Sequence, residues 1–194
     1  MVAALAGSGG CVRARPPTVV AEASETTAVR APLSTIDGPV RRGQLVANAV
    51  VQRNVDGDTI EVSLLLASGR AAKTREKVRL IGIDTPETKR PDTPIECFGI
   101  KASAATASLV PPSTPVRLER DVEERDRYGR LLAYVFRSSD GLFINHELVR
   151  TGFAASYPYP PNVAYADTFR DAAAAAQAVG VGLWGTCGDP HVPA

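Results

Sequence analysis

Two aspartates flank a glycine in the stretch 54–62, NVDGDTIEV, and acids at this spacing could bind a metal ion. The alternating apolar residues that follow Asp58 predict a strand. Asp-Gly before such a run is also a common turn signal, so this stretch alone leaves two interpretations open. Asp56 and Gly57 could shape an ordinary turn, or Asp58 could supply half of a metal site.

A second stretch, 79–91 with the sequence RLIGIDTPETKRP, brings Arg79, Asp84 and Glu87 within nine positions. Its apolar residues predict a strand that continues up to Asp84, and Pro86 biases the preceding residue towards an extended loop. An arginine, an aspartate and a glutamate that meet where a strand gives way to a loop are a common way to build a site.

The third stretch, 126–134, reads DRYGRLLAY and places Arg127 and Arg130 three positions apart around a Tyr128–Gly129 turn. Charges of both signs surround this turn, so an exposed, solvated turn is the ordinary explanation when it is considered alone.

These stretches lie among segments with the period of strands and helices. Strands are predicted over about 44–52, 58–66, 74–83, 115–120 and 131–136. The first three are joined by short turns, which suggests an antiparallel meander. Helices are predicted over about 95–110, 143–151 and 165–179, with proline or glycine after each. The pattern predicts an α+β, mainly β, fold: a five-stranded Greek-key barrel of the oligonucleotide-binding (OB) type with about three helices.

Composition and charge fit one folded domain with a tail. The chain has 194 residues, 44% hydrophobic, and a formal net charge of +1, so nucleic acid could be bound only through a local basic cluster. No apolar run approaches the length that spans a bilayer. We expect a signal-like segment and disordered linker over 1–41, a folded domain over 42–188 and a C-terminal tail over 189–194.

Cys11 follows a short apolar piece, 2–6, and four small residues, which is similar to an export signal that leads into a bacterial lipoprotein cysteine. A basic start is missing and the apolar piece is short, which a true start codon further upstream would explain. We expect an exported bacterial protein, secreted or anchored to the cell envelope, with Cys11 as a candidate lipidation site. An ordinary disordered N-terminus is the alternative.

The chain has no C-x-x-C spacing, which argues against a zinc ribbon. A bridge between Cys97 and Cys187 would close a long loop and stabilise the fold by about 4 to 5 kcal/mol in the chain-entropy model. It would also need an oxidising compartment. Two buried free thiols in a cytosolic protein are the alternative.

Taken together, the three stretches resemble the staphylococcal nuclease (thermonuclease) family over about residues 44–186. Each motif alone is weak, whereas their order and separation together are specific. Further support comes from NHELVRTG at 145–152, YPY at 157–159 and LWG at 183–185. The residues that carry the resemblance are Asp58 in DGDT, Arg79 in VRLIGIDTPE, Asp84, Thr85 and Glu87 in DTPE, and Arg130 in DRYGR.

The resemblance implies a calcium-dependent phosphodiesterase on an OB-type barrel. Asp58 and Asp84 would be carboxylate ligands and the backbone carbonyl of Thr85 a third, which suits Ca²⁺ because that ion takes oxygen ligands in irregular geometry. The implied reaction is hydrolysis of DNA and RNA to products that carry a 3′-phosphate.

The resemblance also implies the catalytic groups. Arg79 and Arg130 would form forked hydrogen bonds to phosphate oxygens, whose charge grows in the five-coordinate transition state. Glu87 would act on the attacking water, either as a general base or by orienting it.

Implied substrate contacts follow from aromatic and basic positions. Tyr128, Tyr157 and Tyr159 match positions near the nucleotide, where aromatic faces stack on any base, as suits a preference for single strands. Ordinary packing is the alternative for each. Arg127 matches a basic position that would touch a terminal phosphate.

The remaining expectations concern partners and the cysteine pair. We expect a monomer without a protein partner, in contact with a membrane only through a lipid anchor at Cys11. Cys97 and Cys187 resemble a pair in other bacterial members of the family, which implies a bridge that ties the C-terminus to the barrel.

Two other functions compete with the nuclease. A catalytically weak nucleic-acid-binding OB module would be favoured by loss of Arg79, Glu87 or an aspartate ligand, and all are present. An envelope protein with a purely structural calcium site would gain nothing from two nearby arginines.

Overall fold

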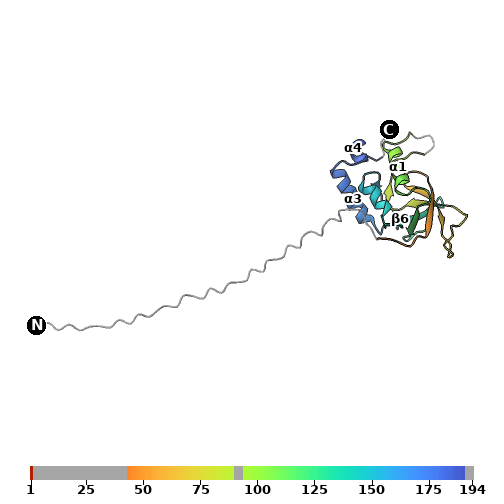
Figure 1. Cartoon of the computed structure of the whole chain (residues 1–194). Helices are drawn as coiled ribbons and strands as arrows, with labels where there is room; N and C mark the ends of the chain where they lie inside the picture. The colour runs from red at the N-terminus through yellow and green to blue at the C-terminus, as the bar shows by residue number, and fades with distance from the viewer. Residues whose placement is uncertain (2–42, 90–93, 191–194) are drawn as a thin grey trace. The chain divides into compact units, whose positions relative to one another are not determined.

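The computed structural model describes Met1, residues 43–89 and residues 94–190 (Figure 1). Five strands close into a barrel in the order β1-β2-β3-β6-β5. Their bounds are β1 Ala49–Asn54, β2 Thr59–Leu64, β3 Glu76–Leu80, β5 Pro115–Glu119 and β6 Leu131–Arg137. The pairs β1–β2 and β2–β3 are antiparallel, which confirms the predicted meander. The barrel confirms the predicted OB-type fold.

Closure of the barrel depends on two later strands. β5 pairs with β1 and with β6 in the antiparallel sense. β3 and β6 pair in parallel, with Arg79 opposite Leu132. Buried residues alternate along β1, β3 and β5, as the period of two requires, whereas β6 is buried at four consecutive positions, 133–136. Fully buried members include Val51, Ile60, Val62, Val78, Leu80, Val116, Val135 and Phe136.

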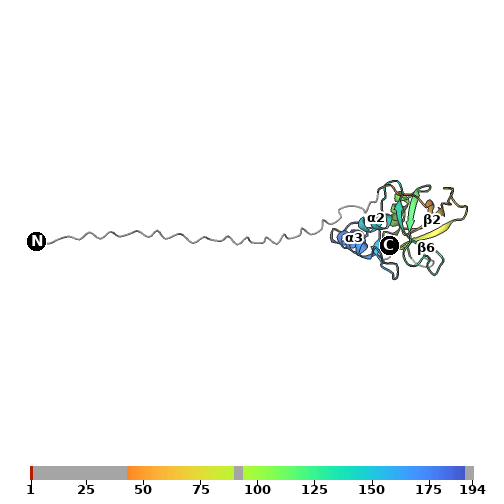
Figure 2. The ribbon, with the colours of Figure 1, turned by 90° about the horizontal axis from the view of Figure 1, so that it is seen from below.

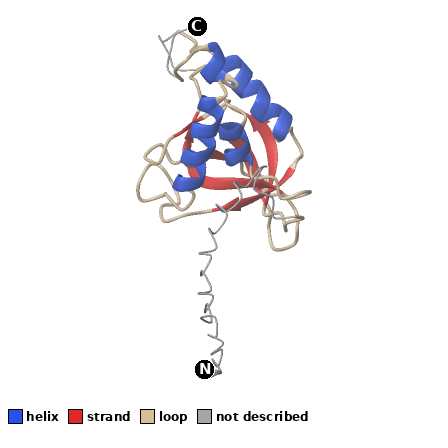
Figure 3. Ribbon diagram, turned by 90° about the vertical axis from the view of Figure 1, so that its left-hand side faces the viewer, coloured by secondary structure: helices blue, strands red, loops and turns tan. Residues whose placement is uncertain are grey.

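The helices gather on one side of the barrel (Figure 3). They are α1 Gly99–Leu109, α2 Ile144–Arg150, α3 Ala166–Ala178 and the short α4 Leu183–Thr186. The first three match the predicted helices, while α4, a four-residue helix, was not predicted. Phe143 packs 4.9 Å from Tyr165 and 5.5 Å from Phe169 between ring centroids, which fixes α2 against α3. No helix in the described residues is long and apolar enough to cross a membrane.

The third predicted strand is wrong at its end. It stops at Leu80, and the chain turns before β4 (Ile83–Asp84), which pairs with β7 (Ala155–Ser156) in a separate two-stranded sheet. Gly82 makes the turn with φ +78, and a Cβ there would lie 2.4 Å from the Phe169 ring. Only glycine combines that backbone angle with that contact. The break takes Asp84 out of the barrel sheet and into the pair of β4 with β7.

The helix predicted from residue 95 begins later, at Gly99, because Phe98 before it has the left-handed φ of 69°. The first strand likewise begins at Ala49 and not at 44. Cys97 forms a disulfide with Cys187, with the Cα atoms 6.0 Å apart. This bond ties the segment before α1 to the end of α4.

Several predictions fall outside the described residues. These are the linker, the signal-like segment and Cys11, all within residues 2–42, and the end of the tail, 191–194. The described residues 43–89 and 94–190 belong to one compact unit. The domain boundary at residue 42 therefore stays a prediction.

Candidate active site

One pocket of about 590 Å³ collects the acids and arginines that the sequence singled out. All predicted metal and catalytic residues line it, together with Arg127, Tyr128 and Tyr157. Tyr159 lines an adjoining pocket of about 700 Å³, which shares Arg79, Arg130 and Tyr157 with the first. The three stretches, far apart in the sequence, therefore meet at one place.

Asp58 occupies the turn between β1 and β2 and is buried. Its Oδ1 accepts a hydrogen bond from the Thr59 hydroxyl at 3.1 Å. Oδ2 accepts from the backbone N–H and the hydroxyl of Thr85, both at 3.2 Å. Gly57 permits this approach, because a Cβ there would lie 2.5 Å from Thr85 Oγ1. Asp56 accepts the Asp58 N–H at 3.2 Å, so Asp56 and Gly57 shape the turn while Asp58 contributes to the pocket.

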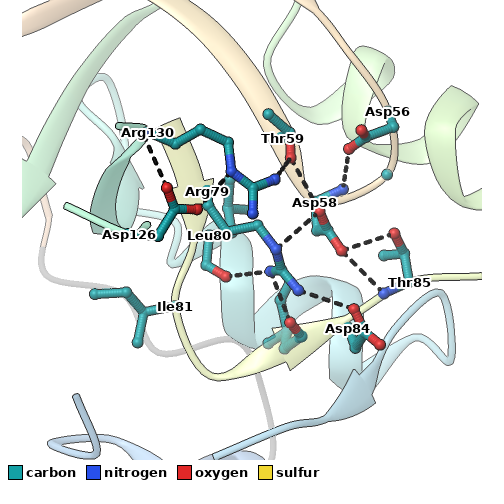
Figure 4. A network of polar contacts seen from close by, with 12 residues as sticks. Asp56, Asp58, Thr59, Arg79, Leu80, Ile81, Asp84, Thr85, Asp126 and Arg130 are labelled. Atoms are coloured by element: carbon teal, nitrogen blue, oxygen red, sulfur yellow. Dashed lines mark hydrogen bonds and ion pairs between the residues drawn. The ribbon is translucent and has the colours of Figure 1, made fainter. Parts of the chain in front are cut away.

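Arg79 lies between the two aspartates proposed as ligands (Figure 4). Its Nε is 3.2 Å from Asp58 Oδ1, and its Nη2 is 2.8 Å from Asp84 Oδ1. Nη1 donates to the backbone carbonyls of Leu80 at 2.6 Å and Ile83 at 2.8 Å. The two carbonyls flank the break between β3 and β4, so the backbone turn also fixes the guanidinium.

Arg130 enters the pocket from the start of β6 and is held by Asp126, which the sequence analysis missed. Arg130 Nε donates to Asp126 Oδ2 at 2.6 Å, while Nη1 reaches the Thr59 hydroxyl only at 3.4 Å (Figure 4). Burial alone would raise the pKa of Asp126, but hydrogen bonds from Arg130 outweigh it and hold that pKa below its usual value. The signal in the sequence was an acid four residues before Arg130 in DRYGR.

Glu87 follows β4 on the loop before α1. Its Oε1 accepts the N–H groups of Thr88 at 2.8 Å and Lys89 at 2.7 Å. The N–H of Glu87 donates to Oε2 of Glu96 at 2.7 Å, and the N–H of Glu96 donates back to the Glu87 carbonyl at 2.9 Å. Glu96, next to the bridged Cys97, was not predicted, and no local pattern marks it.

The acids of the pocket influence one another. Burial, and then the charge of Asp58, raise the pKa of Asp56 above its ordinary value. In the described part of the chain no group of three or more His, Cys, Asp or Glu side chains could hold a metal ion. The predicted ligand set contains only two such side chains, because its third ligand is a backbone carbonyl. Its donors are all oxygen, which fits a hard cation such as Ca²⁺.

The aromatic residues lie at the rim. Tyr157 and Tyr159 are 49% and 66% exposed, and their rings are nearly parallel, 13° apart with centroids separated by 6.5 Å. Tyr128 lies beneath the guanidinium groups of Arg127 at 4.8 Å and Arg130 at 5.6 Å. Exposed rings beside cations suit contact with bases and phosphates more than core packing.

The barrel together with this pocket of arginines and carboxylates is typical of an enzyme built on an OB fold. Comparison with known proteins identifies the family. A model of the staphylococcal nuclease homologue family matches residues 77–186. The thermonuclease of Staphylococcus intermedius is 37% identical over 151 residues, 76% of this chain and 84% of that protein. The thermonuclease of Staphylococcus hyicus is 38% identical over 134 residues, 69% and 73% of the two chains. Endonuclease YncB of Bacillus subtilis is 37% identical over 145 residues, 74% and 64% of the two.

The chain belongs to the staphylococcal nuclease family. The expected resemblance is thereby confirmed.

Proposed function

We propose that this chain is a calcium-dependent endonuclease that hydrolyses DNA and RNA to products with a 3′-phosphate. Its family makes it a nuclease, an enzyme that hydrolyses phosphodiester bonds. One observation carries the finer proposal: Arg79 contacts both Asp58 and Asp84 in the pocket that also contains Glu87 and Arg130.

Asp58, Asp84 and the Thr85 carbonyl would hold the Ca²⁺ ion. When bound there, Ca²⁺ would supply positive charge that offsets the charge of the anionic phosphodiester. Water and substrate oxygens would complete its ligands, since the protein offers few. The carboxylates of Asp58 and Asp84 repel each other when no cation lies between them. The guanidinium of Arg79, which contacts both, offsets that repulsion.

The two arginines would stabilise the transition state. Arg79 is fixed by four contacts, so its charge is oriented before the reaction begins. Arg130 is anchored through Nε by Asp126, while among the described residues its terminal nitrogens make only one long contact, to Thr59. Those terminal nitrogens are the end that would turn to a phosphate oxygen.

Glu87 would orient or deprotonate the attacking water. The N–H groups of Thr88 and Lys89 hold one carboxylate oxygen, which restricts the rotation of the side chain. Glu96 holds the Glu87 backbone from the other side. A base fixed in this way needs little reorganisation at the moment of reaction.

The rim residues support the expected substrate. Tyr157 and Tyr159 would stack with bases, which a duplex hides and a single strand presents. Tyr128 would also lie near the nucleotide, and Arg127 would contact a terminal phosphate. The Cys97–Cys187 disulfide supports export, because such bonds persist in oxidising compartments. A monomer and a lipid anchor at Cys11 stay predictions.

The decisive test is digestion of heat-denatured DNA and of RNA, with excess calcium or with a calcium chelator. We expect digestion only with calcium, products with 3′-phosphate ends, and a loss of orders of magnitude in kcat for Glu87→Gln. Asp171→Asn, an exposed acid on α3, is the matched control and should digest normally. Folded protein that binds DNA without digesting it would refute the proposal in favour of a binding module.

The metal assignment has its own test. Titration calorimetry should show that Asp58→Ala weakens calcium binding, with Asp171→Asn again as the control. Unchanged calcium affinity in Asp58→Ala would refute the ligand assignment while leaving the nuclease activity itself intact.

A further inference from the structure

A row of basic side chains runs outward from the pocket along β3. Arg79 and Lys77 both line the pocket, and the buried Val78 and Leu80 point into the core on the alternate positions. Because side chains alternate along a strand, Arg79, Lys77 and the preceding Arg75 share the outer face of the barrel. Successive members of this row are about 7 Å apart at their Cα atoms.

The row widens across the neighbouring strands. The register places Arg53 of β1 opposite Glu61 of β2, and Glu61 opposite Lys77 of β3. Glu61 is enclosed by two arginines: Arg53 Nη2 lies 2.9 Å and Arg75 Nη1 3.1 Å from its carboxylate. The side chain of Glu61 is 10% exposed, whereas those of Arg53 and Arg75 are 50% and 57% exposed. The acid is therefore covered, and the surface that meets solvent is cationic.

Two features make Lys77 available to an external anion. It is exposed, and within the described residues its ammonium group makes no ion pair or hydrogen bond. The exposed Lys73 adds a further positive charge in the connection between β2 and β3, two residues before Arg75. This connection lies at the end of the molecule opposite α3 (Figure 2). A chain whose net charge is only +1 thus concentrates basic groups beside its active site.

We propose that this row, Lys73, Arg75 and Lys77 with Arg53, binds the sugar–phosphate backbone of the single-stranded substrate beyond the bond that is cleaved. Two observations support this occupant: the exposed surface of the row is cationic, which complements a polyanion, and the row is continuous with the pocket. The face of strands 2 and 3 is also where OB barrels bind oligonucleotides. The inference rests on the nuclease function proposed above and makes the enzyme favour long substrates.

The size of the effect follows from counterion release. One phosphate contact on a single strand contributes a slope of about −0.7 to log K against log salt concentration, which is about fivefold in affinity at 0.1 M salt. Lys77→Gln should therefore weaken binding of a single-stranded 20-mer about fivefold and reduce the slope by about 0.7. Lys73→Gln together with Lys77→Gln should weaken it roughly 25-fold, if the two contacts add.

The experiment measures two quantities. The first is the affinity for a labelled single-stranded 20-mer in chelator, by fluorescence anisotropy over a range of salt concentrations. The second is the ratio of kcat/KM for a long single strand to kcat/KM for a trinucleotide, with calcium. Lys77→Gln should lower both, and Lys77→Arg should restore both. Arg170→Gln removes one exposed charge from α3 and should change neither.

The outcomes separate the two proposals. Equal affinity and salt slope in Lys77→Gln and in the unmodified protein would overturn the inference, whatever the activity. A reduced affinity and slope in a protein that does not cleave would support the row and refute the nuclease mechanism. A loss of kcat/KM that is equal for the trinucleotide and the long strand would also overturn the inference, because it would place Lys77 at the cleaved bond.

Discussion

Replacing Arg79 by lysine tests whether one guanidinium holds the two acidic stretches together. Arg79 contacts Asp58 and Asp84 and donates to two backbone carbonyls. The single ammonium group of lysine cannot span all four. The loss of two charge-assisted hydrogen bonds, in a side chain that is 16% exposed, should reduce the free energy of unfolding by about 2–4 kcal/mol. For a domain of this size that lowers Tm by about 4–16 °C.

Calcium should change this result in a defined direction. A cation bound between Asp58 and Asp84 offsets their repulsion, so the difference in Tm between Arg79→Lys and the unmodified protein should shrink when calcium is added. The kcat should fall by about 10²–10³-fold with calcium present, because a fixed donor to the transition state is lost.

The assay is thermal unfolding followed by the fluorescence of Trp184, the one tryptophan of the chain, in chelator and in calcium. Arg170→Lys on the exposed face of α3 is the matched control and should leave Tm and kcat unchanged. The reasoning fails if Arg79→Lys keeps its Tm in chelator, or if calcium widens the difference.

Three further substitutions test other contacts. Asp126→Asn should lower kcat about tenfold, because Arg130 loses its charged anchor. Steady-state kinetics, with Asp171→Asn as the control, would measure this change. An unchanged kcat in Asp126→Asn would contradict the prediction. Removing Cys97 and Cys187 together should cost about 4–5 kcal/mol in the chain-entropy model, measured by urea unfolding, and equal stability would refute that estimate. Burial lowers the pKa of His146 in the folded protein, so the unfolded chain binds the proton first and stability falls as pH drops below about 6.5. His146→Gln should flatten the decline of Tm between roughly pH 7 and 5, and an unchanged pH profile would exclude this histidine as the cause.

Much of the fold could be predicted because the local sequence pattern favours the same strands and helices that the folded chain forms. The alternation around Val78 and Leu80 marks a half-buried strand, and Gly152 and Gly180 follow helices where left-handed residues are needed. The break at Gly82 was missed, because apolar residues lie on both sides of it. The close contact of Gly82 with the Phe169 ring on α3 exists only in the folded chain, and no pattern near residue 82 reveals it.

The candidate site could also be predicted only in part. Asp58, Arg79 and Arg130 could be singled out because each lies in a motif with a specific order. The contacts that position them could not: Glu96 holds Glu87, and Thr85 holds Asp58, through pairings that exist only after the chain folds. Lys77 carried a signal that was overlooked, since it alternates with Arg79 on the same strand.

The parallel pairing of β3 with β6 has a consequence for how activity arises during folding. This pairing sets Arg79 beside the start of the strand that follows Arg130, and the segments it joins are distant in the sequence. Contacts of that kind form late, because the chain entropy lost in closing a long loop must be offset first. A partly folded chain that has completed only the β1–β3 meander lacks Arg130, one of the two arginines that we propose to act in catalysis. Under that proposal the chain gains activity only when the barrel closes, and the recovery of digestion on refolding would report the rate of that closure.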